Sequence, residues 1–167
     1  MLYATGDALR RETPAFRNDG SDADWEHRAG DHHDGMEFFG LDRSGKRRDP
    51  RGNECGLLAM NHEAISQQYL HAIGATPNDA ATRPAAEVDK EIAAHGVSVV
   101  EVHRHGRAWR YERDSAFNRR ITPDTRIEIA GPLRGHPLMV TRYDPSGRRT
   151  RGTINNCGTA SRRGARC

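Results

Sequence analysis

Three short clusters of polar residues hold the side chains that could carry out chemistry. The first, Asp31-His32-His33-Asp34-Gly35, places two carboxylates and two imidazoles in a glycine-flanked loop. Hard cations such as Ca²⁺ take several oxygen ligands, and a loop can direct neighbouring carboxylates at one point. A solvated polar loop has the same composition, so this motif alone leaves both interpretations open.

The second cluster, Asn61-His62-Glu63, follows an apolar run, at the point where a rigid element is expected to end. It is not the zinc-protease motif H-E-x-x-H, because residue 66 is a serine. Its polar groups could belong to a site, or they could cap the helix that follows.

The third cluster, Asn155-Asn156-Cys157, also ends a strand-like run. A thiolate binds iron or zinc well, and flanking amides can donate hydrogen bonds to a bound anion. The alternative is a cysteine that packs as a small apolar residue.

Short elements, mostly of β character, must position these clusters. Helices are predicted at Ala64 to Ile73 and at Pro84 to His95. In the second helix a proline stands at the start, a glycine follows the end, and one apolar face is formed by Ala85, Val88 and Ile92. Apolar runs and alternating patterns between turn residues predict the strands. These are Met36 to Leu41, Gly56 to His62, Val97 to His103, Ala108 to Arg113, Arg126 to Ala130, Leu138 to Tyr143 and Thr150 to Ile154. Successive short antiparallel strands favour a propeller or a sandwich over a parallel sheet.

Charge and composition exclude several classes of protein. The formal net charge is +3 and the pI is near 9.0. The arginines are scattered, apart from Arg148 to Arg151 with Arg162, Arg163 and Arg166, so we expect no nucleic-acid partner. No apolar run approaches the length of a membrane span, so we expect no membrane partner. The three cysteines, Cys55, Cys157 and Cys167, have neither zinc-ribbon spacing nor an obvious disulfide framework.

Taken together, these segments resemble the N-terminal part of PhoX-type alkaline phosphatases. The matching stretches lie in family order between residues 31 and 157: HHDGMEFFGL, GLLAMNHE, EVDKEIAAHGVSVVEVHR, WRYERDSAFNRRIT, IAGPLRGHPL and GTINNC. The resemblance implies a mainly β fold, a partial β-propeller of antiparallel blades with one or two short helices. It also implies a periplasmic or secreted enzyme, exported by the twin-arginine route, that hydrolyses organic phosphomonoesters with Fe³⁺ and Ca²⁺.

The resemblance extends to single residues. Cys157 matches the family's iron-ligand cysteine, and Asn156 matches the neighbouring amide, which we expect to bind substrate. Glu63 and Asp34 match acidic positions that are expected to bind calcium or support the metal cluster. We also expect His62 to contact substrate.

The resemblance divides the chain in two. Residues 1–157 are expected to be the N-terminal segment of a PhoX-type propeller domain, and residues 158–167 a tail unrelated to the family. The family continues with a P-W-G-T stretch and paired glutamates that hold the metals, whereas this chain reads GTASRRGARC and has no export signal at its start. We therefore expect the fragment to be inactive alone. The alternatives are a propeller-type hydrolase of another ester or a lactone, and a small basic binding module.

We predict that residues 158–167 are the product of a frameshift. Bases that can encode Ser161 to Arg166 give Ala-Pro-Trp-Gly-Thr when read two positions later, which is the stretch that the family has here. Translation of the downstream DNA in the shifted frame tests this. Paired glutamates followed by strand-like sequence are expected, and their absence would show that the tail is a genuine terminus.

Overall fold

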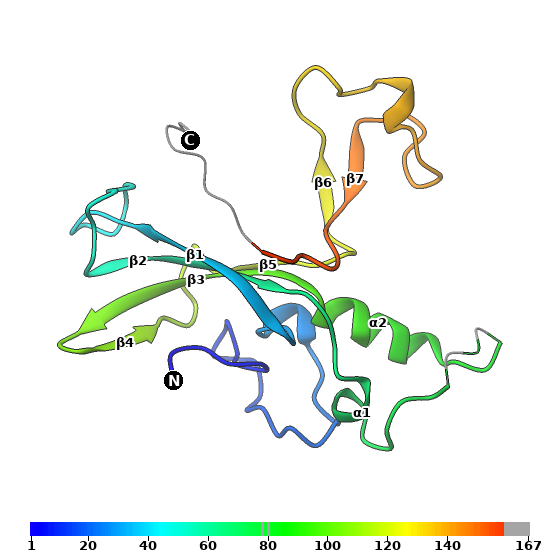
Figure 1. Cartoon of the computed structure of the whole chain (residues 1–167), viewed down its shortest axis with the longest axis horizontal. Coiled ribbons are helices and arrows are strands. Elements are labelled where there is room, and N and C mark those ends of the chain that lie inside the picture. The colour runs from blue at the N-terminus through cyan, green and yellow to red at the C-terminus, as the bar shows by residue number, and fades with distance from the viewer. Residues whose placement is uncertain (78, 80, 159–167) are drawn as a thin grey trace.

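The computed structural model describes residues 1–77, 79 and 81–158, and these residues form mainly antiparallel β structure (Figure 1). One five-stranded sheet has the order β1-β2-β3-β4 with β5 also paired to β3, and β6 and β7 form a separate ribbon. The strands are β1 His33–Gly40, β2 Cys55–His62, β3 Gly96–His105, β4 Ala108–Tyr111, β5 Arg119–Ile121, β6 Arg126–Glu128 and β7 Arg149–Arg151. The helices are α1 Gln67–Leu70 and α2 Ala85–Ala94, with 3₁₀ turns η1 Trp25–His27 and η2 Pro137–Met139. The predicted mainly β, antiparallel class is confirmed.

Strands β2 and β3 form the centre of the sheet. All eight residues of β2 pair with β3, from Cys55 opposite His103 to His62 opposite Gly96. Successive side chains of a strand point to opposite faces, so every second residue shares a face. One face is buried and packs against the N-terminal segment; the core there comprises Leu58, Met60, Val100 and Val102 from the sheet with Tyr3, Leu9 and Ala29.

The other face of the sheet is more open. Phe39, Ala59 and Val97 line a groove there of about 410 Å³, which also contacts the segment of residues 153–158. In Figure 1 the helices and the N-terminal segment lie on one side of the sheet, and the β6-β7 ribbon stands on the other. The sheet therefore uses one face for its core and leaves the other for the C-terminal segment.

A buried arginine organises the N-terminal segment. Arg28 is only 1% exposed, and its guanidinium donates to three backbone carbonyls: Ala23 at 2.8 Å, Gly6 at 3.1 Å and Pro14 at 2.8 Å. Because these carbonyls lie far apart in the sequence, one side chain fixes the path of a loop that has little secondary structure.

Helix α2 has nearly the predicted bounds, but its predicted apolar face is wrong. Val88 is 37% exposed, whereas Glu91 is 7% exposed. Glu91 accepts hydrogen bonds from His71 at 2.9 Å and from Gln67 at 3.2 Å, and it pairs with Arg83. A carboxylate with several donors can be buried, and here these contacts, not an apolar stripe, set the orientation of the helix.

Two other predicted elements are wrong. The helix expected from Ala64 to Ile73 is confined to Gln67–Leu70, because the backbone at His71 is extended. The strand expected from Leu138 to Tyr143 is absent, and the 3₁₀ turn η2 takes its place. Pro137 has no backbone N–H to donate to a neighbouring strand. A second turn follows, closed by backbone hydrogen bonds between Thr141 and Asp144. Because residues 138–143 form no strand, they cannot pair with β7, and β7 pairs with β6. Among the described residues, no helix is long and apolar enough to cross a membrane.

We expect Arg28→Ala to lower the free energy of unfolding by about 3 kcal/mol or more, because it leaves three carbonyls without their donor. Arg10→Ala is the control, since the Arg10 side chain is 55% exposed, and it should cost less than about 0.5 kcal/mol. Urea denaturation followed by circular dichroism measures both. Equal stability of the two variants would show that Arg28 does not hold the segment together.

Candidate metal centre

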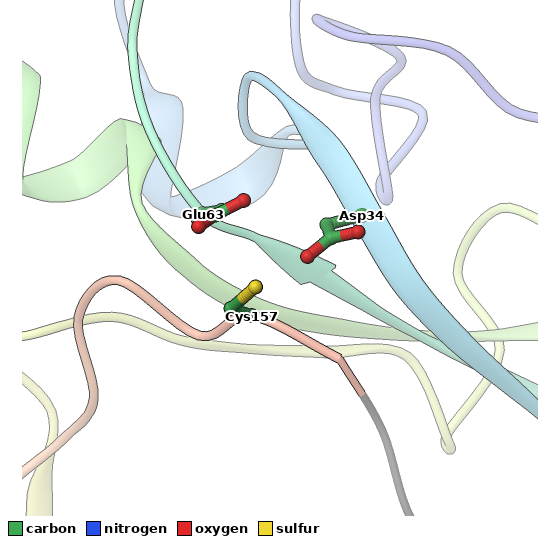
Figure 2. A group of neighbouring side chains, drawn as sticks. All are labelled: Asp34, Glu63 and Cys157. Carbon is green, nitrogen blue, oxygen red and sulfur yellow. The ribbon is translucent and has the colours of Figure 1, made fainter.

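Two carboxylates and a thiol from three separate segments meet on the open side of the sheet (Figure 2). Asp34 lies near the start of β1, Glu63 directly follows β2, and Cys157 lies beyond β7. One ligand atom from each residue lies within 4.8 Å of the other two. The structure thus brings together the three residues predicted as metal ligands.

The pairing of β1 with β2 places the two carboxylates. The strands are antiparallel, with His33 opposite His62, so the start of β1 and the end of β2 lie at the same edge. The register is irregular between His33 and Met36, which is where Asp34 lies. Side-chain alternation then directs Asp34 and Glu63 away from the core face that His33 and His62 occupy.

Three hydrogen bonds hold the segment around Cys157 against this edge. The Gly158 N–H donates to Asp34 Oδ2 at 3.0 Å, and the Asn61 side-chain amide donates to the Gly158 carbonyl at 2.7 Å. The Asn155 amide donates to the Glu63 carbonyl at 3.2 Å. The position of the thiol is therefore tied to both strands that carry the carboxylates.

The electrostatics of the group follow from its three acidic members. Hydrogen bonding to Asp34 first, and then to Glu63, raises the pKa of the Cys157 thiol. Hydrogen bonds lower the pKa of Asp34, the one from the Gly158 N–H most and the one from the Cys157 thiol next. Asp34 therefore favours its ionised form and Cys157 its protonated form, so a bound cation would favour the thiolate.

The donor set fits metal ions of the predicted kinds. A cysteine thiolate suits iron or zinc, and carboxylate oxygens suit calcium as well as iron. Asp31, from the same loop as Asp34, is excluded from the group because its Oδ2 accepts the Ser66 N–H at 2.7 Å. Of the acidic cluster that the sequence presented, only Asp34 joins the group.

The two residues predicted to bind substrate lie in different places. Asn156 is half-buried and lines the groove beside Cys157, where its amide donates to the Gly96 carbonyl at 3.3 Å. His62 is fully buried on the core face, its Nε2 is 2.9 Å from Ser98 Oγ, and burial lowers its pKa to about 2. The structure therefore does not bring His62 to the group.

Asn61 belongs to the second polar cluster of the sequence, but no role of its own was predicted for it. It is 7% exposed, lines the groove and holds Gly158. Alternation along the strand was the signal that could have found it, because Asn61 and Glu63 are two residues apart and share a face, whereas His62 between them must point to the core.

Replacing Asp34 by Asn and Glu63 by Gln together should lower the pKa of Cys157, since both carboxylates raise it. The thiolate fraction at pH 8 then rises, and alkylation of Cys157 by iodoacetamide in the metal-free chain should become a few-fold faster. Peptide mass spectrometry across pH measures the rate. The control is Glu26→Gln with Asp89→Asn, which changes the net charge equally at a distance. An unchanged pH profile in the first variant would contradict the assigned contacts.

Comparison with known proteins shows what the whole chain is similar to. The sequence model of the family described as alkaline phosphatase PhoX matches residues 1–161. Among solved structures, Pseudomonas fluorescens PhoX in complex with vanadate, a transition state analogue, is similar with a TM-score of 0.79 and 34% sequence identity. The match covers 94% of this chain and 25% of that one, so the chain spans about a quarter of the relative's length. A search of curated proteins found no match.

The family match extends over almost all of the chain, including all three candidate metal ligands. Residues 159–167 lie outside the described residues, so the origin of the tail stays a prediction. On the match over residues 1–161 and the structural similarity, the chain belongs to the PhoX family of alkaline phosphatases.

Proposed function

We propose that this chain supplies part of the metal centre of an enzyme that hydrolyses organic phosphate monoesters. The observation that carries the proposal is the convergence of Asp34, Glu63 and Cys157 within 4.8 Å. Membership of an alkaline phosphatase family supports phosphate monoesters as the substrates. A further support is that the similar solved structure contains vanadate, described there as a transition state analogue.

We assign the residues to ions by the chemistry of their donors. Cys157 would hold Fe³⁺ through its thiolate, and Asp34 and Glu63 would supply oxygen ligands to the iron or to Ca²⁺. When bound, such ions act as Lewis acids on phosphoryl oxygens and stabilise the charge that develops there.

Asn156 is proposed to orient the phosphate group. A side-chain amide has two N–H donors, and the hydrogen bond to the Gly96 carbonyl uses one of them. The second can donate to an anion in the groove beside Cys157. His62 is left out of the proposed site because it is buried on the other face.

The proposed site needs further ligands. Calcium alone takes six to eight oxygen ligands, whereas the group provides two carboxylates and one thiolate. We therefore propose that these residues by themselves do not support turnover. By its family, the complete enzyme would be a periplasmic or secreted protein.

The isolated chain should bind a metal ion through Cys157 without turning over substrate. Fe³⁺ should produce a thiolate-to-metal charge-transfer absorption that Cys157→Ser abolishes and Cys55→Ser retains, because Cys55 is buried in β2. Hydrolysis of p-nitrophenyl phosphate with Fe³⁺ and Ca²⁺ should stay at background. Metal-dependent turnover that is lost in Cys157→Ala would show that the chain is sufficient as an enzyme.

A chimaera tests the phosphatase assignment directly. Residues 1–157 would replace the matching segment of Pseudomonas fluorescens PhoX, and the hybrid should hydrolyse p-nitrophenyl phosphate. Cys157→Ala in the hybrid should reduce kcat/KM by about a thousand-fold or more, since it removes a metal ligand. Cys55→Ala is the matched control. A folded hybrid that prefers a phosphodiester or a lactone would favour the alternative of another hydrolase.

A further inference from the structure

The β6-β7 ribbon concentrates positive charge. Between residues 124 and 151 there are six arginines and three acidic residues, an excess of three, which equals the formal net charge of the whole chain. Within the ribbon, Arg126 is paired directly opposite Arg151, and Glu128 opposite Arg149. Like charges at directly opposed positions destabilise a sheet, so the Arg126 and Arg151 pair calls for a counter-charge.

The neighbouring carboxylates supply this counter-charge only in part. Arg149 Nε binds Glu128 at 2.7 Å, and Arg151 pairs with Asp124. Among the described residues, no carboxylate pairs with Arg126. The ribbon therefore retains an unpaired guanidinium next to two others.

Asp144 also lies at this end of the ribbon, and its oxygens are already occupied. It accepts hydrogen bonds from Ser146 Oγ at 2.6 Å and from the backbone N–H groups of Arg148 at 2.7 Å and Arg149 at 2.6 Å. The hydrogen bond from Ser146 is the main cause that lowers the pKa of Asp144 to about 2. Asp144 thus serves the turn, and two other carboxylates remain to pair with three guanidinium groups.

These residues enclose a groove of about 190 Å³. It is lined by Arg126, Tyr143, Asp144, Arg149, Thr150 and Arg151. The Tyr143 ring lies near two guanidinium groups, with the Arg151 Cζ at 5.0 Å and the Arg142 Cζ at 5.5 Å from the ring centre, and such cation–π contacts are attractive. Pockets for drug-sized ligands measure about 300–1,000 Å³, so this groove fits a group of phosphate size and not a whole organic molecule.

We propose that this groove binds the phosphate group of small phosphorylated molecules. Guanidinium groups bind phosphate oxygens through paired N–H donors, and a dianion here would relieve the repulsion between Arg126 and Arg151. The site is distinct from Asp34, Glu63 and Cys157 and needs no metal ion. Arg151 is six residues from Cys157, and a chain of that length spans at most about 20 Å even when fully extended. Anions bound in the groove are therefore also concentrated near the metal-ligand group.

Calorimetric titration of the full metal-free chain with inorganic pyrophosphate at low ionic strength tests the proposal. Saturable 1:1 binding is expected. Arg126→Gln should weaken it about ten-fold, because Arg126 has no carboxylate partner and its loss leaves the ion pairs of the ribbon intact. Arg107→Gln, in the exposed β3-β4 turn, removes the same charge and should change the affinity less than about two-fold.

Nuclear magnetic resonance keeps the test independent of folding defects. Pyrophosphate should shift the side-chain Nε–H resonances of Arg149 and Arg151, and the amide spectrum of Arg126→Gln should remain that of a folded chain. Absence of saturable binding to the wild-type chain, or an equal loss in both variants, would overturn the proposal. Neither result bears on the metal-ligand group, because no ligand residue is changed and no metal is added.

Discussion

The unbroken pairing of β2 with β3 is the constraint on which the rest of the structure depends. It fixes which side chains of each strand share a face, because alternation leaves no freedom once the register is set. Leu58, Met60, Val100 and Val102 on one face bury the N-terminal segment. The other face then necessarily carries Asn61 and directs Glu63 to the open side. A slip of one residue would exchange His62 for Asn61 and remove the carboxylate from the group.

The parts of this arrangement that follow from local pattern could be predicted. Strands β1, β2 and β3 are short apolar runs between turn residues, and α2 has a proline before it and a glycine after it. The three candidate metal ligands could be chosen only through family resemblance, since nothing local shows that Cys157 lies beside Asp34. A contact across that many residues is decided by the tertiary path of the chain.

Two of the differences share one physical origin, which is that polar contacts outweighed hydrophobic periodicity. Glu91 is buried where Val88 was expected, because His71 and Arg83 supply its partners. The short strand β5 has two arginines in three residues and no apolar run, but Arg120 donates to the carbonyls of Ala93 and His95 and so holds it against the C-terminal end of α2. Such networks depend on which distant donors are available, and a linear pattern does not contain that information.

The route of the chain to Cys157 depends on a close approach between the base of the ribbon and the sheet. The Gly152 N–H donates to the Thr125 carbonyl at 2.7 Å, and a Cβ at Gly152 would lie 2.0 Å from the Thr122 carbonyl. Only glycine fits at that distance, so the chain can leave β7 and run along the edge of the sheet. Asn156 then bonds to Gly96, whose φ of +108° also requires glycine. Two glycines far apart in sequence thus help to determine where the thiol lies, and substitution at either would displace Cys157 without changing any of the three candidate ligands.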